Sequence, residues 1–321
     1  CATEFGDSTP VRPNEDAQNE RLAATKLRIK RPQLARFLPG GEQESTSTAV
    51  DWLSPHVKTH LLLQAHLSRV TLPTDYMTDQ RSVLEQCGRL MQALHDIARL
   101  VGGARTLLAV LTLKQSIAKN HWWDDEDPLR ACLPPKWIAS QDGTIKLGKI
   151  LGEKRLGVSV PELQSKLGVD RSSSVEEFLE KTRDRRQITE DLARLLCAWP
   201  IVDVKMNDGN REWTLQSLST RDLTVPAASE QTWSVRLELV GPTRNAHQHL
   251  HQTQWIVLLV DKSQDRVLAY AQTAFKDANH VRSVRLRWQT PGVATKTPIQ
   301  LHLLLLSDTF PAGTDQECEL H

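Results

Sequence analysis

Five basic residues fall within eleven positions near the start of the chain, a spacing that could set several positive charges along one phosphate backbone. No acidic residue stands between Glu20 and Glu42 to offset them. The five are Lys26, Arg28, Lys30, Arg31 and Arg36. Cationic side chains bind nucleic-acid phosphates by releasing counterions, so this cluster would act most strongly at low salt. A charged run is also typical of a solvated loop, and both interpretations stay open.

Three histidines at alternate positions raise the question of a metal site. His247, His249 and His251 would project to one side of a strand, where three imidazoles could hold zinc. No carboxylate lies nearby in sequence, and the Gly-Pro pair a few residues earlier favours a loop. The acidic run at 124–127 directly precedes a proline, which favours a polar turn. The sequence therefore predicts no metal site.

Residues 143–149 have the glycine and lysine spacing of a phosphate-binding P-loop, but the next residue is Ile150. A working P-loop needs a serine or threonine there to hold magnesium. No hydrophobic strand precedes the stretch, so we interpret the match as chance. We expect no ATP hydrolysis by this chain itself and no cofactor.

The bulk composition is that of a folded protein with more than one domain. The chain has 321 residues, of which 39% are hydrophobic and 25% charged. The net charge of +1 means that any nucleic-acid contact must be a local patch. No apolar run approaches the roughly 20 residues that span a bilayer, and no signal peptide is visible. The five scattered cysteines predict a reducing compartment, the nucleus or the cytoplasm.

Apolar periodicity predicts a small helical bundle over residues 1–138. The expected helices cover 14–27, a segment beginning at Pro55, 78–101 and 106–119. We expect Ser54 to cap the second helix with its side-chain oxygen, and Gly102-Gly103 to end the third. The predicted buried seam of that third helix is Val83, Cys87, Leu90, Leu94, Ile97 and Val101.

The rest of the chain changes character twice. Residues 139–200 carry short helical patterns broken by glycine, which favour a helix-loop-helix domain. After Pro200 the period drops to two, as in Val235, Leu237 and Leu239, and many short strands predict a β-sandwich over residues 201–321. The expected fold is multidomain α+β: an N-terminal helical bundle, a helix-loop-helix domain and a C-terminal immunoglobulin- or fibronectin-type III-like β-sandwich.

The exact residue order of several short segments is informative in addition to their apolar periodicity. They are "LLLQAHLSR" (61–69), "LPTDY" (72–76), "TEFGDSTPVRPNED" (3–16), "HWWDDEDPL" (121–129) and "LLLLSDTFPAGTDQE" (303–317). Together they resemble the Sec-sixty-three homology unit of Ski-two-like nucleic-acid helicases, whose bundle, helix-loop-helix and sandwich follow in this order. Stretches 73–76 and 121–129 are more similar to the branch of the activating signal cointegrator complex and of ribosome quality control than to the spliceosomal U5 branch.

The resemblance implies a non-catalytic C-terminal accessory module of an ATP-dependent RNA or DNA helicase, with the ATPase motifs upstream on the same polypeptide. In such helicases the helix that matches 78–101 is called the ratchet and lies along the single strand leaving the motor. Its candidate nucleic-acid-binding residues here are Arg81, Arg89, Gln92 and Arg99, joined by Lys26, Arg28, Lys30 and Arg31. Guanidinium groups suit this role because they pair with phosphate and stack on bases. A solvated face with ion pairs such as Glu85 with Arg89 is the alternative.

The resemblance also implies protein partners. These would be the upstream helicase cassette and subunits of a ribonucleoprotein, cointegrator or ribosome-associated complex, with no membrane partner. Ser283, Arg285 and Arg287 form an outward stripe on a predicted strand that could dock an acidic partner, although an ordinary solvated sheet face has the same pattern. The alternative function is an autonomous protein that binds single-stranded nucleic acid.

Overall fold

The computed structural model describes parts of the N-terminal third and of the C-terminal third of the chain. The described residues are Thr9, 11–27, 50–101, 103–120, Trp122, Glu180, 201–207, 212–214, 228–240, 254–275, 281–290, 301–307 and 316–320. The predicted helix-loop-helix domain lies outside the described residues apart from Glu180, as do the domain boundaries near 138 and 200. Those boundaries stay predictions.

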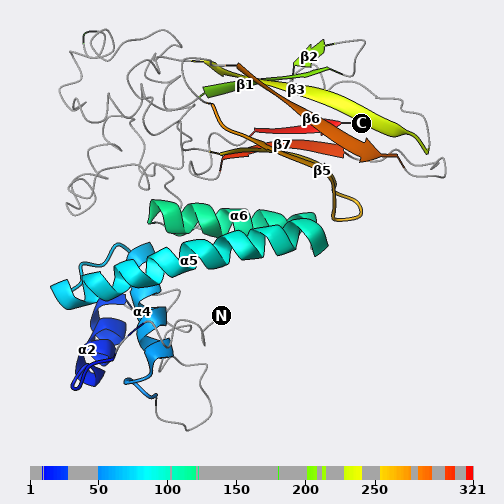
Figure 1. Cartoon of the computed structure of the whole chain (residues 1–321). Coiled ribbons are helices and arrows are strands. Elements are labelled where there is room, and N and C mark those ends of the chain that lie inside the picture. Colours follow the sequence, from blue (N-terminus) through cyan, green and yellow to red (C-terminus); the bar gives the residue numbers. More distant parts are fainter. Residues whose placement is uncertain are drawn as a thin grey trace. The chain divides into compact units, whose positions relative to one another are not determined.

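The described elements are helices followed by strands, an α+β arrangement (Figure 1). The helices are α2 (Asp16–Arg21), the π-helical segment η1 (Leu22–Leu27), α4 (Pro55–Leu67), α5 (Thr74–Val101) and α6 (Ala104–Lys119). The strands are β1 (Ile201–Asn207), β2 (Glu212–Thr214), β3 (Glu230–Val240), β4 (Trp255–Asp261), β5 (Arg266–Thr273), β6 (Val281–Gln289), β7 (Leu301–Ser307) and β8 (Gln316–Leu320).

The chain divides into two compact units. One contains the chain up to Ile97 and the end of α6 from Ser116, and is called the helical unit below. The other contains Ala98–Gln115 and the eight strands that the structure describes, and is called the strand unit. The sequence pattern alone grouped α6 with the other helices, whereas the structure groups most of it with the strands.

The first two predicted helices differ from the sequence expectation, one in its cap and one in its first residue. Helix α4 begins at Pro55 as predicted, but the side chain of Ser54 makes no capping hydrogen bond, so the predicted cap is wrong. Proline at the first helical position, with its fixed φ, is the start signal that remains. The first helix begins at Asp16 rather than at Asn14, because Asn14 has a φ of 70° and belongs to a turn.

The motif at 61–69 holds the end of α6 inside the helical unit. His66 donates a hydrogen bond from Nε2 to the carbonyl oxygen of Ile117 at 2.8 Å. Arg69 Nε donates to the carbonyl oxygen of Asn120 at 2.7 Å, and Trp122 Nε1 donates to Ser68 Oγ at 3.1 Å. Side chains of this motif thereby satisfy carbonyl groups that the end of a helix leaves without intrahelical partners.

The buried seam of α5 is partly different from the predicted one. Val83 and Cys87 are buried as expected, but Leu94 is 38% exposed and Ile97 is 58% exposed. The seam continues instead through Met91, His95 and Ala98. Steps of four residues drift around a helix that repeats every 3.6 residues, so the buried face turns along α5. Near its end, Ala98 packs with residues of the strands, which explains why a single stripe does not describe the whole helix.

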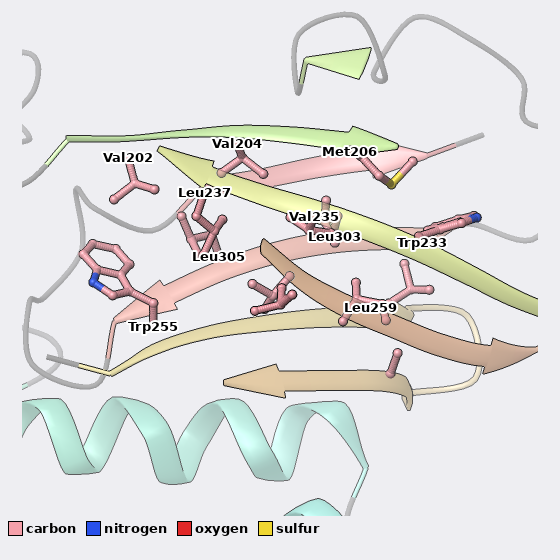
Figure 2. Packing of buried hydrophobic residues seen from close by; sticks show 14 of the residues in the cluster. Val202, Val204, Met206, Trp233, Val235, Leu237, Trp255, Leu259, Leu303 and Leu305 are labelled. Atoms are coloured by element: carbon pink, nitrogen blue, oxygen red, sulfur yellow. The ribbon is translucent and has the colours of Figure 1, made fainter. Parts of the chain in front are cut away.

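The strands form two four-stranded antiparallel sheets that share one core. The strand orders are β2-β1-β3-β6 and β5-β4-β7-β8. Figure 2 shows side chains from both sheets meeting, among them Val235 and Leu237 from β3 and Leu303 and Leu305 from β7. The predicted alternation is confirmed, since these residues are at most 2% exposed. The immunoglobulin- or fibronectin-type III-like identity of the pair of sheets stays a prediction.

Helix α6 covers the other face of the second sheet, within the strand unit. Its Leu107 and Leu111 pack against Leu258 of β4 and Leu304 of β7. Strands β4 and β7 are therefore buried on both faces, which accounts for the continuous apolar run of β4.

Asp265, in the β4–β5 turn, fixes the start of α6. Its carbonyl oxygen accepts a hydrogen bond from the amide of Ala104 at 3.0 Å, and its carboxylate accepts one from the amide of Arg105 at 2.9 Å. These bonds satisfy two of the free amides at the start of the helix, and the negative charge suits its dipole. Gly103 lies so close that a Cβ atom there would be 2.6 Å from Asp265 Oδ2 and 2.8 Å from its carbonyl oxygen.

A Gly103→Ala variant should therefore lower the free energy of unfolding by about 1–3 kcal/mol, because the new methyl group overlaps backbone that cannot move cheaply. Gly88→Ala is the matched control, since a Cβ atom at Gly88 meets nothing within 4 Å on an exposed helix position. It should raise stability by about 0.5–1 kcal/mol. Urea denaturation measures both, and equal effects at the two glycines would contradict the close packing on Asp265.

Candidate nucleic-acid interface

The predicted site residues of the long helix lie on one polar face of α5. Arg81, Arg89, Gln92 and Arg99 are all exposed. At 100° per residue they fall within about a quarter of the helix circumference, on the side away from buried Val83 and Cys87. Because this face follows from helix geometry alone, the sequence predicted the grouping.

The polar side chains of this face differ in their ion pairs and hydrogen bonds. Arg81 pairs with Glu85 through an N–O distance of 3.4 Å, with both side chains largely exposed. Such a surface pair contributes only about 0.3–0.5 kcal/mol, so it would yield to a competing phosphate. Gln92 donates to Asp96 at 3.2 Å. The expected Glu85–Arg89 pair is not the one formed, and Arg89 has no ion pair with any residue that the structure describes.

Arg99 has a structural contact within the strand unit. Its guanidinium lies over the ring of Tyr270 in β5, 5.2 Å from the ring centroid. A cation–π contact at an exposed site contributes about 0.5–1 kcal/mol. Arg99 thus helps to hold the end of α5 against β5, and a nucleic acid would have to bind the guanidinium in that position.

Only one residue of the predicted basic cluster can be placed. Lys26 is exposed in η1, and its Nζ donates to the carbonyl oxygen of Thr71 at 3.0 Å. The other members, Arg28, Lys30, Arg31 and Arg36, lie outside the described residues. The cluster as a phosphate-binding element therefore stays a prediction.

Four buried or half-buried charges set the position of α5 within the helical unit. Lys58 of α4 is 0% exposed, and its Nζ lies 2.7 Å from Glu15 Oε2 and 2.7 Å from Asp79 Oδ2. Arg12 completes the group, with Nη1 2.7 Å from Glu15 and 2.9 Å from Asp79. Two cations and two carboxylates neutralise one another, as a buried charge requires. The cluster joins the start of α2 to both α4 and α5.

Tyr76 extends this charge cluster into a hydrogen-bonded chain. Its hydroxyl donates to Asn19 Oδ1 at 2.7 Å, and Asn19 Nδ2 donates to the carbonyl oxygen of Trp52 at 2.7 Å. Lys58 Nζ lies 5.0 Å from the centroid of the Tyr76 ring. Gln80, one turn along α5, donates to the carbonyl oxygen of Leu62 at 2.9 Å and fixes α5 to α4 a second time.

The pKa values of the cluster follow from these contacts. Burial on its own would raise the pKa of Glu15, but hydrogen bonds from Lys58 and Arg12 outweigh it, so the pKa lies below 4.5. Burial likewise opposes the shift at Asp79, where hydrogen bonds from Arg12 and Lys58 hold the pKa below 3.8. Hydrogen bonds to Asp79 and Glu15 raise the pKa of Arg12. Burial, and then the two carboxylates, raise the pKa of Tyr76.

Sequence reasoning missed Lys58, although a signal was present. Lys58 precedes Leu61, Leu62 and Ala65 by three, four and seven residues, which places it on the buried face of α4. A lysine in that register must find carboxylates or distort the packing. Nothing in the sequence identifies Glu15 and Asp79 as its partners, because they lie 43 and 21 residues away.

The remaining candidates are mostly beyond what the structure describes. The histidines at 247, 249 and 251, the acidic run at 124–127 and the P-loop-like stretch at 143–149 lie outside the described residues. Among the described ones, no group of histidine, cysteine or acidic side chains has the arrangement of a metal site. Ser283, Arg285 and Arg287 are exposed on β6, as the alternation predicted. No helix within the described part of the chain could cross a membrane.

Comparison with known proteins gives a family match over the full length. The model described as the Sec63 Brl domain matches residues 1–321. The human activating signal cointegrator 1 complex subunit 3 is 28% identical over 358 aligned residues, covering 100% of this chain and 15% of that protein. Its Bos taurus counterpart is 41% identical over 129 residues, covering 40% of this chain and 5% of that protein.

A third relative is the RQC trigger complex helicase SLH1 of Saccharomyces cerevisiae, 39% identical over 129 residues, which are 39% of this chain and 6% of that protein. The chain thus spans a small fraction of the length of the curated relatives it matches. Among solved structures, the Pseudomonas fluorescens alkylpurine DNA glycosylase AlkC covers 95% of this chain and 98% of its own. Its 14% identity and TM-score of 0.20 carry no argument.

Replacing Lys58 with Met should lower the free energy of unfolding by about 3–5 kcal/mol at pH 7, because two buried carboxylates lose their only fully buried cation and keep only the half-exposed Arg12. The deficit should shrink as the pH falls toward 3, since Glu15 and Asp79 become neutral. In the unaltered protein their contribution is present above pH 4.5 and 3.8 and is lost as the pH falls through their lower folded pKa values.

Urea denaturation at several pH values tests this prediction. The control is Lys262→Met, at an exposed position in the β4–β5 turn, which should change stability by about 0.5 kcal/mol or less. A Lys58→Met deficit that stays constant with pH would contradict the assignment of Glu15 and Asp79 as its ionised partners.

Proposed function

Because the chain belongs to the Sec63 Brl domain family, as its sequence predicted, we propose that it is a non-catalytic C-terminal accessory module of an ATP-dependent, Ski-two-like RNA or DNA helicase. The family match over residues 1–321 is the observation that carries this proposal. Two relatives are named as helicases, the yeast RQC trigger complex helicase SLH1 and the Arabidopsis thaliana DExH-box ATP-dependent RNA helicase DExH14. In this proposal, ATP is hydrolysed by a part of the same polypeptide that lies upstream of the module.

The proposed role has two parts, docking to proteins and flanking the nucleic-acid path. The names of the relatives support the first, since they place those proteins in the activating signal cointegrator 1 complex and in the RQC trigger complex. Partners of the same kind, together with the upstream helicase cassette, are proposed for this chain. The exposed arginines of α5 support the second part, because phosphate pairing needs guanidinium groups open to a ligand.

The docking role predicts that the purified 321-residue chain, used as bait, captures the helicase cassette of its own polypeptide or purified subunits of a cointegrator or ribosome-associated complex. Capture should persist without ATP, because the module itself does not hydrolyse it. Binding is measured by pull-down of the purified components and quantified by calorimetry. Failure to capture any of these proteins would remove the docking role, and ATP turnover by the chain alone would remove the non-catalytic assignment.

The alternative is an autonomous protein that binds single-stranded nucleic acid. The feature that favours it is Arg89, which is exposed and has no ion pair among the residues that the structure describes. An Arg89→Ala, Lys30→Ala double variant should then bind a single-stranded oligonucleotide more weakly and reduce the salt dependence by about one ion per lost phosphate contact. Arg81→Ala is the comparison, and its loss should be smaller because Arg81 must first leave Glu85. Fluorescence anisotropy over a salt series measures these effects.

An unaltered chain that shows no binding at low salt would exclude the autonomous function. The accessory role would survive that outcome, since the module could still contact a strand that the motor delivers.

A further inference from the structure

A hollow in the helical unit lies between the first helix and the start of α5. Its volume is about 280 Å³. It is called the α2–α5 pocket here and is lined by Gln18, Arg21, Leu22, Lys26, Leu72, Pro73 and Tyr76. These residues are distinct from the arginine face of α5, and nothing in the proposed function uses the pocket itself.

The lining is divided by chemical type. Leu22, Leu72 and Tyr76 are buried and form an apolar floor together with Pro73. Gln18, Arg21 and Lys26 are exposed, and all three come from the wall made by α2 and η1. Among the described residues that line the pocket there is no carboxylate, and Arg21 and Lys26 are the cations of this wall.

The shape of the pocket is held by contacts on both sides. Tyr76 is held in place by the hydrogen bond from its hydroxyl to Asn19 and by the cation–π contact of its ring with Lys58. On the other wall, Lys26 Nζ is anchored on the carbonyl oxygen of Thr71, which uses one of its three donors. Leu22 and Lys26 both belong to a π-helical segment, a rare conformation that is found often at functional sites.

We propose that the α2–α5 pocket binds an acidic segment of a protein partner. One bulky apolar side chain of that segment inserts over Leu22, Leu72 and Pro73, while its carboxylates pair with Arg21 and Lys26. Charge complementarity with the basic wall defines this occupant, and the apolar floor defines its anchor. The inference rests on the docking role proposed above and gives that role a location and a partner chemistry.

The size of the pocket agrees with a side-chain anchor. Sites for small molecules and cofactors have volumes of about 300–1,000 Å³. At about 280 Å³, this pocket lies at the lower edge of that range and has room for one large side chain.

The lining favours a protein segment over single-stranded nucleic acid. Sites for single strands combine exposed aromatic rings, on which bases stack, with a basic groove along the backbone. Among the described residues that line the pocket, the one aromatic side chain is that of Tyr76, which is 2% exposed and offers no open ring face. The cations come from α2 and η1, which form one wall of the pocket, so they do not make the continuous basic groove that the backbone of a single strand follows.

Selection from a phage-displayed peptide library, with the whole chain as bait, tests the proposal. Enriched peptides should carry a bulky apolar residue within about one helical turn of two or more acidic residues. Affinities of synthetic copies are then measured by fluorescence anisotropy against three variants. Gln18→Trp should fill the pocket from its exposed rim, and Arg21→Glu, Lys26→Glu should reverse the wall, each weakening binding by about 10-fold or more.

Ala17→Trp is the matched control, because Ala17 is exposed on the same helix and does not line the pocket. Its affinity should stay within about twofold of the unaltered chain, and thermal unfolding verifies that all variants fold. Competition by a single-stranded oligonucleotide, or enrichment of peptides without acidic residues, would overturn the proposal. If the Gln18→Trp variant captures complex subunits as well as the unaltered chain does, the pocket is not the binding site, but the docking role stands. If the unaltered chain captures no subunit at all, the docking role itself is removed.

Discussion

The helical unit depends on burying one lysine without leaving its charge unpaired. Lys58 is fully inaccessible to solvent, and an isolated ammonium group in that position would cost several kcal/mol. Glu15 and Asp79 offset this cost only if α4, α5 and the turn before α2 keep their mutual register to within hydrogen-bond distance. Because a shift of a few ångströms would leave charges unpaired, the cluster favours one arrangement over other apolar packings of the same helices.

Both candidate binding surfaces of the helical unit follow from this constraint. Asp79 turns one face of α5 toward the cluster, so the face with Arg81, Arg89 and Gln92 is left to solvent. Tyr76, whose hydroxyl bonds to Asn19, closes the floor of the α2–α5 pocket. A change in the charge cluster would therefore alter the pocket as well as stability.

A different constraint applies to the strand unit. Its two sheets share one core, and the apolar outer face of the second sheet must also be buried. The inner faces are filled by alternating residues and by aromatic contacts such as that of Trp233 with Trp288, whose rings meet edge to face with centroids 5.2 Å apart. Helix α6 covers the second sheet, and Asp265 fixes where that helix starts. The close approach at this point leaves room only for glycine at position 103.

Local regularities of the chain were readable without coordinates. The period of two located the strands and their buried residues, Pro55 marked the start of α4, and helix geometry alone placed the α5 arginines on one face. Literal stretches of sequence identified the family. These features depend on neighbours a few residues apart, and the periods of a helix and a strand are fixed by backbone geometry.

Tertiary structure decided everything that depends on distant partners. It buried Lys58 between Glu15 and Asp79, turned the seam of α5 away from Leu94 and Ile97, and set Arg99 over Tyr270. It also placed α6 on the strands and opened a pocket between α2 and α5. A sequence pattern specifies which face of a helix or strand is apolar. The surface that covers this face comes from another segment of the chain, and so does the charge that neutralises a buried charged side chain. Only folding brings these segments together.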